Sequence, residues 1–273
     1  MSPLPYRLCA IDLDDTLLGA DHLISERNAR AIHAVSEMGV VVAIASGRMY
    51  ETTLKFVDQL KLDTPIICYN GAMVKHPHTG EVWMEERVPA DIAGAVLDYC
   101  AEHRLQLNYY VNDLLYTAEY TSWMKLYYDR TLAPIQVLPD MAVALRGTEP
   151  IKMIIVDSLE ATNALLPQFR DRFGAALYVT KSNDEYLEFM PPNADKGKAL
   201  DIVARRYGLT AADTIAFGDS WNDIPMLKWA GLGLAVANAK SGALEAADRI
   251  IPRNSEDGVA QALEEIFSLN VGS

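Results

Sequence analysis

Cysteine is scarce in this sequence. Among 273 residues there are three, Cys9, Cys68 and Cys100, and they lie far apart with no CxxC pair. A small secreted scaffold needs many closely spaced cysteines for its disulfides, and a thiolate zinc site needs them in pairs, so both classes are excluded. Cys9 and Cys68 stand in apolar runs typical of strands, and we expect buried, reduced thiols.

Positive charge is also in short supply. Lys and Arg total 24 against 37 Asp and Glu, which gives a formal net charge of −13, and no dense basic run occurs. Proteins that bind the nucleic-acid backbone by counterion release need a basic face, so nucleic acid is not an expected partner. A small anion can still bind to an acidic protein where a metal ion, a lysine or a helix N-terminus assists.

Long hydrophobic runs are missing too. No apolar stretch of the sequence is long enough to span a bilayer. The opening MSPLPYRLCAIDLDD has only a short apolar stretch that soon ends in three acids, which is unlike a signal peptide. We therefore expect a cytoplasmic protein without a membrane partner and, because no interface signal is evident, a monomer.

Apolar residues make up half of the sequence, and their spacing predicts alternating strands and helices. The hydrophobic fraction is 50%, and the length suits two domains. The opening third reads strand, helix, strand, helix, strand over these ranges: Arg7–Leu13, Ser25 as N-cap to Gly39, Val40–Ala45, Ser46-Gly47-Arg48 to Leu60, and Ile66–Tyr69. Continuous apolar strands between helices predict an α/β fold with a doubly wound, Rossmann-like parallel sheet.

The character of the sequence changes after Asn70. Hairpin-like segments, helices and Tyr-rich alternating strands follow, and the parallel pattern resumes near Pro191. Such a mixture between two halves of a parallel pattern indicates a separate α+β domain inserted into the first. We predict a core domain of residues 1–82 and 191–273 with an inserted domain of residues 83–190.

The first acidic cluster ends the first strand. Because side chains alternate along a strand, Asp12 and Asp14 are expected to face the same way. Two carboxylates at one strand end repel each other and are tolerated best when a hard cation lies between them. One carboxylate could then attack phosphorus while the other transfers a proton. The alternative is a solvated acidic loop.

A second acidic cluster, from Gly218 to Asp223, follows another short strand. In open parallel sheets ligands bind beyond the carboxyl ends of the strands, where both clusters are expected to lie. Asp219 and its neighbours would there complete an oxygen-rich magnesium site. They could equally cap a helix start, a role that is compatible with metal binding.

Two further segments stand at expected helix starts. Ser46-Gly47-Arg48 offers a hydroxyl and free backbone amides, which suit a phosphoryl group, although such tripeptides are also common caps. Lys196 begins the helix that runs to Tyr207, where the helix dipole disfavours a cation. A clamp on a bound anion would explain its placement, and an exposed lysine is the alternative.

Together these segments resemble the haloacid dehalogenase-like hydrolase superfamily, and within it the Cof-type sugar-phosphate phosphatases. Four ordered motifs carry the resemblance, and Asn70-Gly71-Ala72 is a further match. The four motifs are Asp12 to Leu18, Ser46-Gly47-Arg48, Asp195 to Leu200, and Gly218 to Asp223. A large insert between the second and third motifs is similar to the cap called C2, which by resemblance closes over the active site and selects the substrate.

The resemblance implies a magnesium-dependent phosphatase of small phosphomonoesters, such as sugar phosphates or phosphorylated cofactors. Asp12 would be the nucleophile that becomes an aspartyl phosphate, and Asp14 the general acid and base. Mg²⁺ would be bound by the carboxylates of Asp12 and Asp219 and by the backbone carbonyl of Asp14. Asp15 stands where the family often has glycine, and Asp tolerates unusual backbone angles better than most residues.

The remaining motif residues are implied in phosphate and substrate binding. Ser46 and Lys196 would hold the phosphoryl oxygens, and Gly47 would offer a backbone amide. Asn222 and Asp223 would support the metal and phosphate ends of the site. The physical chemistry agrees, because phosphoryl transfer depends on in-line positioning and on charge neutralisation.

Two other functions remain open from the sequence. A phosphotransferase such as a phosphomutase would return the phosphoryl group to a sugar instead of to water. A receiver-type signalling module also combines acids, Mg²⁺ and a lysine on a parallel sheet, but it is a single compact domain without a large insert.

Overall fold

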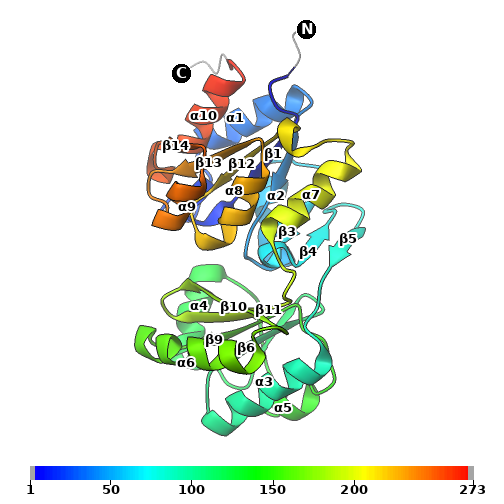
Figure 1. The fold of residues 1–273 in the computed structure, drawn as a ribbon, viewed down its shortest axis with the longest axis vertical. Helices are drawn as coiled ribbons and strands as arrows, with labels where there is room; N and C mark the ends of the chain where they lie inside the picture. The colour runs from blue at the N-terminus through cyan, green and yellow to red at the C-terminus, as the bar shows by residue number, and fades with distance from the viewer. Residues whose placement is uncertain (1–3, 270–273) are drawn as a thin grey trace. The chain divides into compact units, whose positions relative to one another are not determined.

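The computed structural model describes residues 4–269, and the chain divides into two compact units. The core unit comprises Met1–Met84 and Asp195–Ser273, and the inserted unit comprises Glu85–Ala194. The first junction lies two residues, and the second four residues, beyond the boundaries predicted from the sequence. Each unit has its own sheets and helices (Figure 1).

A five-stranded parallel sheet forms the centre of the core unit. Its strand order is β14-β13-β12-β1-β2, so β1 lies between the strands of two chain halves that are far apart in sequence. The strands are β1 (Leu8–Ile11), β2 (Val41–Ile44), β12 (Thr214–Gly218), β13 (Leu232–Val236) and β14 (Arg249–Ile251). Every pair in this sheet is parallel, so all carboxyl ends meet at one edge.

Helices lie on both sides of this sheet (Figure 1). They are α1 (Glu26–Glu37), α2 (Tyr50–Gln59), α7 (Lys196–Arg206), α8 (Ile224–Trp229), α9 (Ser241–Ala246) and α10 (Gly258–Ile266). Helix α1 packs against α10, and α7 against α8. As predicted, Ser25 caps α1, where its side chain accepts a hydrogen bond from the backbone N–H of Asn28. The predicted fold class, a doubly wound α/β core with an inserted α+β unit, is confirmed.

The helix expected to open at Ser46-Gly47-Arg48 begins later. Helix α2 starts at Tyr50, and the preceding Met49 has extended backbone angles. The Ser46 hydroxyl accepts a hydrogen bond from the backbone N–H of Arg48 at 3.1 Å. Such a local side-chain bond offers the backbone an alternative to helix, so the tripeptide forms a turn after β2.

The expected third strand of the parallel sheet belongs to a different sheet. Strand β3 (Ile66–Cys68) pairs antiparallel with β4 (Met73–Lys75), and β5 (Val82–Glu85) completes this three-stranded sheet. A single parallel bridge, Ala45 to Ile67, joins β3 to the end of β2. The hairpin-like segments predicted after Asn70 are found as the neighbouring strands β4 and β5, and β3 meets the parallel sheet through that bridge.

The inserted unit contains a six-stranded sheet in the order β10-β11-β9-β6-β7-β8. Its strands are β6 (Leu107–Val111), β7 (Leu114–Thr117), β8 (Ile135–Val137), β9 (Lys152–Val156), β10 (Tyr178–Asn183) and β11 (Tyr186–Met190). Its helices are α3 (Ala90–His103), α4 (Ser122–Thr131), α5 (Met141–Ala144) and α6 (Leu159–Phe173). One sheet face packs with α3 and α6 around Tyr109, Phe169 and Phe189. This packing explains much of the aromatic content of the insert.

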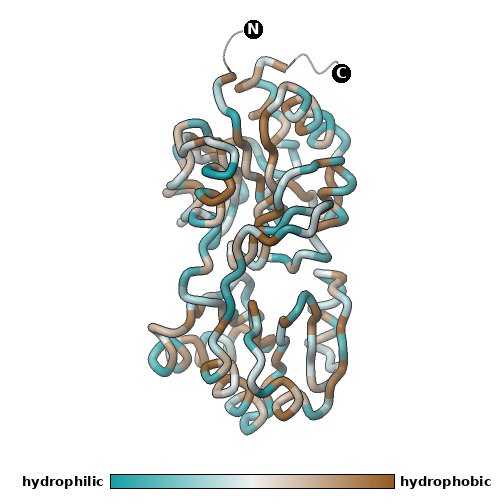
Figure 2. Tube along the Cα trace, turned by 90° about the vertical axis from the view of Figure 1, so that its right-hand side faces the viewer, coloured by the Kyte–Doolittle hydropathy of each residue, from teal (hydrophilic) through white to brown (hydrophobic). Residues whose placement is uncertain are grey.

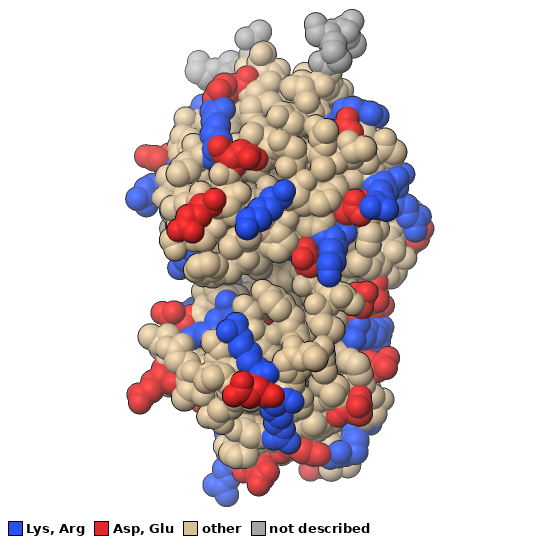
Figure 3. Space-filling view, in the orientation of Figure 1, with Lys and Arg blue, Asp and Glu red and all other residues tan. Residues whose placement is uncertain are grey.

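The distribution of hydropathy and charge matches these folds. In Figure 2 the hydrophobic segments of the core unit gather in its interior, and hydrophilic segments lie on its outer helices and loops. On the face drawn in Figure 3, Lys and Arg lie among Asp and Glu without a dense basic patch. No helix within residues 4–269 combines the length and apolarity needed to cross a membrane.

Gly71 lies where the chain meets the start of α7, and we expect its replacement to be more costly than that of another glycine with the same backbone angle. Gly71 has φ +91° and Gly39 has φ +90°, a region that costs other residues roughly 1–2 kcal/mol. A Cβ at Gly71 would also collide with the Asp195 carbonyl and lie 2.7 Å from the Lys196 nitrogen, whereas at Gly39 it would meet nothing within 4 Å.

Gly71→Ala should therefore lower the free energy of unfolding by about 1–3 kcal/mol more than Gly39→Ala, the matched control. Chemical denaturation of both variants measures the difference. Equal losses would show that the close approach between Gly71 and α7 is not a constraint on the fold.

Candidate active site

Asp12 is the first residue after β1, and the structure places it inside the core unit. Its backbone N–H donates to the Phe217 carbonyl of the neighbouring β12 at 3.0 Å, so the parallel sheet fixes its position. Only 5% of the residue is exposed. A buried carboxylate is costly unless it is paired, and the structure supplies a cation for it.

That cation is Lys196, the first residue of α7. Its Nζ lies 2.6 Å from Asp12 Oδ1 and 2.6 Å from Asp223 Oδ1, and the residue is completely buried. The unfavourable position of a lysine at a helix start is offset by Asp195, whose carboxylate accepts from the backbone N–H groups of Gly197 and Lys198. The alternative of an exposed lysine is therefore wrong.

The second acidic cluster follows β12 and joins the same site. Asp223 uses Oδ2 to accept from the backbone N–H groups of Asp219 at 3.0 Å and Ser220 at 2.9 Å, which leaves Oδ1 for Lys196. Asp219 accepts from the Thr16 hydroxyl at 3.0 Å. Asp12, Asp219 and Asp223 each offer a carboxylate oxygen, and these three oxygens lie within 4.8 Å of one another.

The charges of this cluster do not balance. Burial, and then the nearby Asp223, raise the pKa of Asp12 to about 8 although Lys196 opposes the shift. Burial, and then Asp12 and Asp223, raise the pKa of Asp219 to about 9. Burial works against the charge on Lys196, but Asp12 and Asp223 outweigh it and raise its pKa above the usual value.

Three carboxylates against one ammonium fit a divalent cation, which would relieve their repulsion. Asp12 and Asp219 are the residues best placed to hold it, because both Asp223 oxygens already accept hydrogen bonds within the protein.

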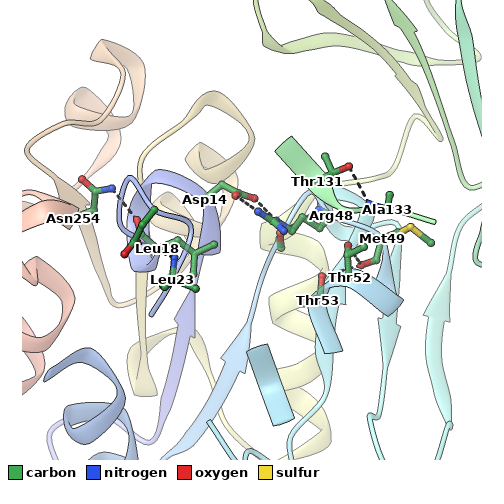
Figure 4. Close-up of polar contacts among 12 residues, drawn as sticks. Asp14, Leu18, Leu23, Arg48, Met49, Thr52, Thr53, Thr131, Ala133 and Asn254 are labelled. Atoms are coloured by element: carbon green, nitrogen blue, oxygen red, sulfur yellow. Dashed lines mark hydrogen bonds and ion pairs between the residues drawn. The ribbon is translucent and has the colours of Figure 1, made fainter. Parts of the chain in front are cut away.

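Asp14 follows Asp12 by two residues and has a charged partner of its own. Strand β1 ends at Ile11, and the chain then turns tightly over Leu13–Leu17. Asp15 has φ 60°, which agrees with the expected tolerance of aspartate at this position. The Asp14 carboxylate points to Arg48, whose Nε and Nη2 donate to its two oxygens at 2.8 and 2.6 Å (Figure 4).

Ser46, Gly47 and Asn222 lie at neighbouring strand ends. Ser46 is buried and bonds within its own turn. Asn222 donates to Asn70 Oδ1 at 2.8 Å, and a Cβ at Gly47 would lie 2.5 Å from that same oxygen. A side chain at position 47 would displace this oxygen from Asn222, and the Asn70 backbone N–H also donates to the Ser46 carbonyl, so Asn70 links the turns that follow β2 and β12.

Sequence reasoning missed two contacts of the site. The bidentate pair of Arg48 with Asp14 was not foreseen, although Arg48 stands in one of the four motifs. The Thr16 bond to Asp219 was also missed, because it joins positions 203 residues apart. An oppositely charged residue within a motif is the only sequence signal that could have indicated the first contact.

We expect the cation-free protein to lose stability as the pH rises, because of this cluster. Aspartates of the unfolded chain lose their protons near pH 4, while Asp12 and Asp219 in the folded chain keep theirs up to about pH 8 and 9. The folded state therefore binds more protons between these values, and the free energy of unfolding falls as pH rises through this range.

Asp219→Asn removes one of these carboxylates and should melt a few degrees above wild type in EDTA at pH 8. The difference should shrink at pH 5, and calorimetry at both values measures it. A melting temperature of Asp219→Asn at or below that of wild type at pH 8 would show that carboxylate repulsion does not limit the stability of this site.

Comparison with known proteins places this geometry in a family. The sequence model of the haloacid dehalogenase-like hydrolases matches residues 9–263. YxeH of Bacillus subtilis is 30% identical over 269 residues, which cover 96% of this chain and 98% of YxeH. The 5-amino-6-(5-phospho-D-ribitylamino)uracil phosphatase YitU of the same bacterium is 29% identical over 288 residues, covering 98% of this chain and all of YitU.

A solved structure supports the same assignment. The crystal structure of a Thermotoga maritima protein aligns with a TM-score of 0.87 at 33% identity, over 95% of this chain and 97% of that chain. The resemblance predicted from the four motifs is confirmed, and the chain belongs to the haloacid dehalogenase-like hydrolase family.

Proposed function

We propose that this hydrolase is a Mg²⁺-dependent phosphatase that acts on small phosphomonoesters through an aspartyl phosphate on Asp12. The observation that carries the proposal is the position of Asp12, which shares Lys196 with Asp223 and lies beside Asp219. A nucleophilic carboxylate needs positive charge around it when it meets an anionic phosphate. Lys196 supplies part of that charge from within the chain.

The reaction follows from the residues in two steps. An Asp12 oxygen attacks phosphorus, the bond from phosphorus to the substrate oxygen breaks, and Asp14 gives a proton to the departing alcohol. Water then attacks the same phosphorus and gives its proton to Asp14, and the bond to Asp12 breaks to release phosphate. Mg²⁺, when bound by Asp12 and Asp219 together with the backbone carbonyl of Asp14, supplies the positive charge that offsets the phosphoryl oxygens.

The other motif residues hold the phosphoryl group and the substrate. Lys196 orients Asp12 and neutralises charge as the phosphoryl group arrives. We assign Ser46 and the backbone amide of Gly47 to the phosphoryl oxygens, and Asn222 to substrate contact, because all three follow strands of the sheet edge where Asp12 lies. Asn222 is held for this role by its hydrogen bond to Asn70.

The substrate class rests on relatives and on the insert. YitU is named for a phosphorylated ribitylaminouracil, and we propose a small phosphorylated metabolite, either a sugar phosphate or a phosphorylated cofactor, as substrate here. We assign the core unit as the catalytic domain and the inserted unit as a C2-type cap that selects the substrate. The protein is expected to work as a cytoplasmic monomer.

A phosphotransferase on the same scaffold is the second candidate. It would use the same aspartyl phosphate and would pass the phosphoryl group to a sugar hydroxyl instead of to water. Release of inorganic phosphate in the absence of a sugar acceptor separates the two functions.

The proposal predicts phosphate release that depends on Mg²⁺ and on Asp12. Wild type should release phosphate from members of a panel of phosphorylated metabolites with Mg²⁺, and EDTA should abolish the release. Asp12→Asn keeps the shape but not the nucleophile, so its kcat should fall on the order of a thousand-fold or more. A colorimetric phosphate assay measures all three.

Asp248→Asn is a suitable control. Asp248 accepts a hydrogen bond from the backbone N–H of Gly233, near the start of β13, and it is not assigned to the site. Its rate should match that of wild type. Undiminished release by folded Asp12→Asn would contradict the assigned nucleophile, and release only when a sugar acceptor is added would favour the phosphotransferase.

A further inference from the structure

The side chain of Arg48 binds the carboxylate of Asp14 through two hydrogen bonds. Two guanidinium nitrogens donate to the two carboxylate oxygens at 2.8 and 2.6 Å, which is the parallel, two-bond geometry that arginine forms with carboxylates (Figure 4). The side chain of Arg48 is only 7% exposed, whereas that of Asp14 is 44% exposed. The arginine is therefore the fixed partner, and the aspartate is the more accessible one.

Several contacts hold Arg48 in place. Its backbone N–H donates to the Ser46 hydroxyl, and its carbonyl accepts from the Tyr69 backbone N–H at 2.9 Å. Its guanidinium carbon lies 5.3 Å from the centre of the Phe56 ring, and Phe56 is buried on α2. The turn after β2, the turn after β3 and helix α2 thus all contribute to the position of one guanidinium group.

The contact separates one carboxylate from the others. Asp12, Asp219 and Asp223 bring their oxygens together, while Asp14, two residues after Asp12, has both of its oxygens on Arg48. A hard cation attracts every nearby carboxylate, and a carboxylate that coordinates the cation cannot donate a proton to a leaving group. Something must therefore keep Asp14 out of the cluster if it is to transfer protons.

We propose that Arg48 is a positioning residue that withholds the Asp14 carboxylate from the metal-binding cluster and so reserves it for proton transfer. The inference rests on the proposed function, in which Asp14 gives a proton to the leaving oxygen and takes one from water. Arg48 itself touches neither phosphorus nor the leaving group in this assignment. Its loss should change the proton-transfer step through Asp14.

The test compares substrates that differ in their need for an acid. The phenolate released from p-nitrophenyl phosphate needs little protonation, whereas the alkoxide released from an alkyl phosphate needs a proton. We would measure kcat and KM with Mg²⁺ for p-nitrophenyl phosphate and for the alkyl phosphate that wild type hydrolyses fastest. The readout is the ratio of the two kcat values, alkyl to aryl.

The variants are Asp14→Asn, Arg48→Met, Arg48→Lys and the double variant Asp14→Asn with Arg48→Met. Asp14→Asn should lower the ratio on the order of a hundred-fold, within the range of general acid catalysis. Arg48→Met should lower it about ten-fold or more through kcat and not through KM. Arg48→Lys keeps the positive charge but loses the two parallel hydrogen bonds of the guanidinium group. Its ratio should therefore lie between those of Arg48→Met and wild type.

Arg27→Met is the matched control. Arg27 forms the same kind of two-bond pair with Glu264, at 2.9 and 2.6 Å, and neither residue is assigned to the site, so the variant should leave the ratio unchanged. Because Arg48 is largely buried, thermal unfolding of Arg48→Met and Arg48→Lys is recorded alongside, and Arg48→Lys carries the test if Arg48→Met does not fold.

The double variant gives the decisive comparison. If Arg48 acts through Asp14, the double variant has the same ratio as Asp14→Asn alone. The inference is overturned if the folded Arg48 variants slow both substrates equally, or if Arg48→Met lowers the ratio further in the Asp14→Asn background. If Asp14→Asn itself leaves the ratio unchanged, the assigned role of Asp14 fails, and the role of Arg48 fails with it.

Discussion

The site depends on one buried interaction, the pair of contacts from Lys196 to Asp12 and Asp223. The lysine is completely buried, and each carboxylate lies 2.6 Å from its Nζ. Taking three ionisable groups out of water is expensive, and removing one partner of such a group leaves an uncompensated charge that costs roughly 3–5 kcal/mol. The interaction therefore ties together three chain segments that are far apart in the sequence.

Much of the surrounding structure follows from that constraint. The parallel order of β12, β1 and β2 brings the two acidic clusters to one edge, and α7 delivers the lysine to the same place. Asp223 can serve Lys196 with one oxygen because its other oxygen already caps the turn after β12. Burial raises the pKa values of Asp12 and Asp219, and the neighbouring carboxylates, which one ammonium does not balance, raise them further.

The sequence carried enough information for the parallel core, because its buried strands are short apolar runs between amphipathic helices. It also carried the acidic motifs and the insert. It did not reveal that β3 leaves the parallel sheet, since an apolar strand of three residues has no feature that selects its neighbours. Strands β8 and β14 and helix α5 were missed for a similar reason, because each is only three or four residues long.

Within the site, the residue types could be predicted better than their orientations. Asp12 and Lys196 were named from the sequence, but the pairing of Asp14 with Arg48 was not foreseen, because it forms beyond the end of β1 at Ile11. Arg48 was likewise placed in a helix, while a hydrogen bond to the Ser46 hydroxyl keeps it in a turn from which it reaches Asp14. Side-chain direction beyond a strand end is set by such local bonds, which sequence spacing does not show.

The central claim is that Asp12, among the aspartates gathered at this edge, receives the phosphoryl group. The most direct measurement is to quench the enzyme with acid during turnover, reduce it with borohydride and map its peptides by mass spectrometry. An aspartyl phosphate is reduced to homoserine, and the account predicts homoserine at position 12. Homoserine at position 14 or 219, or unmodified Asp12 during rapid turnover under conditions that trap other aspartyl phosphates, would contradict it.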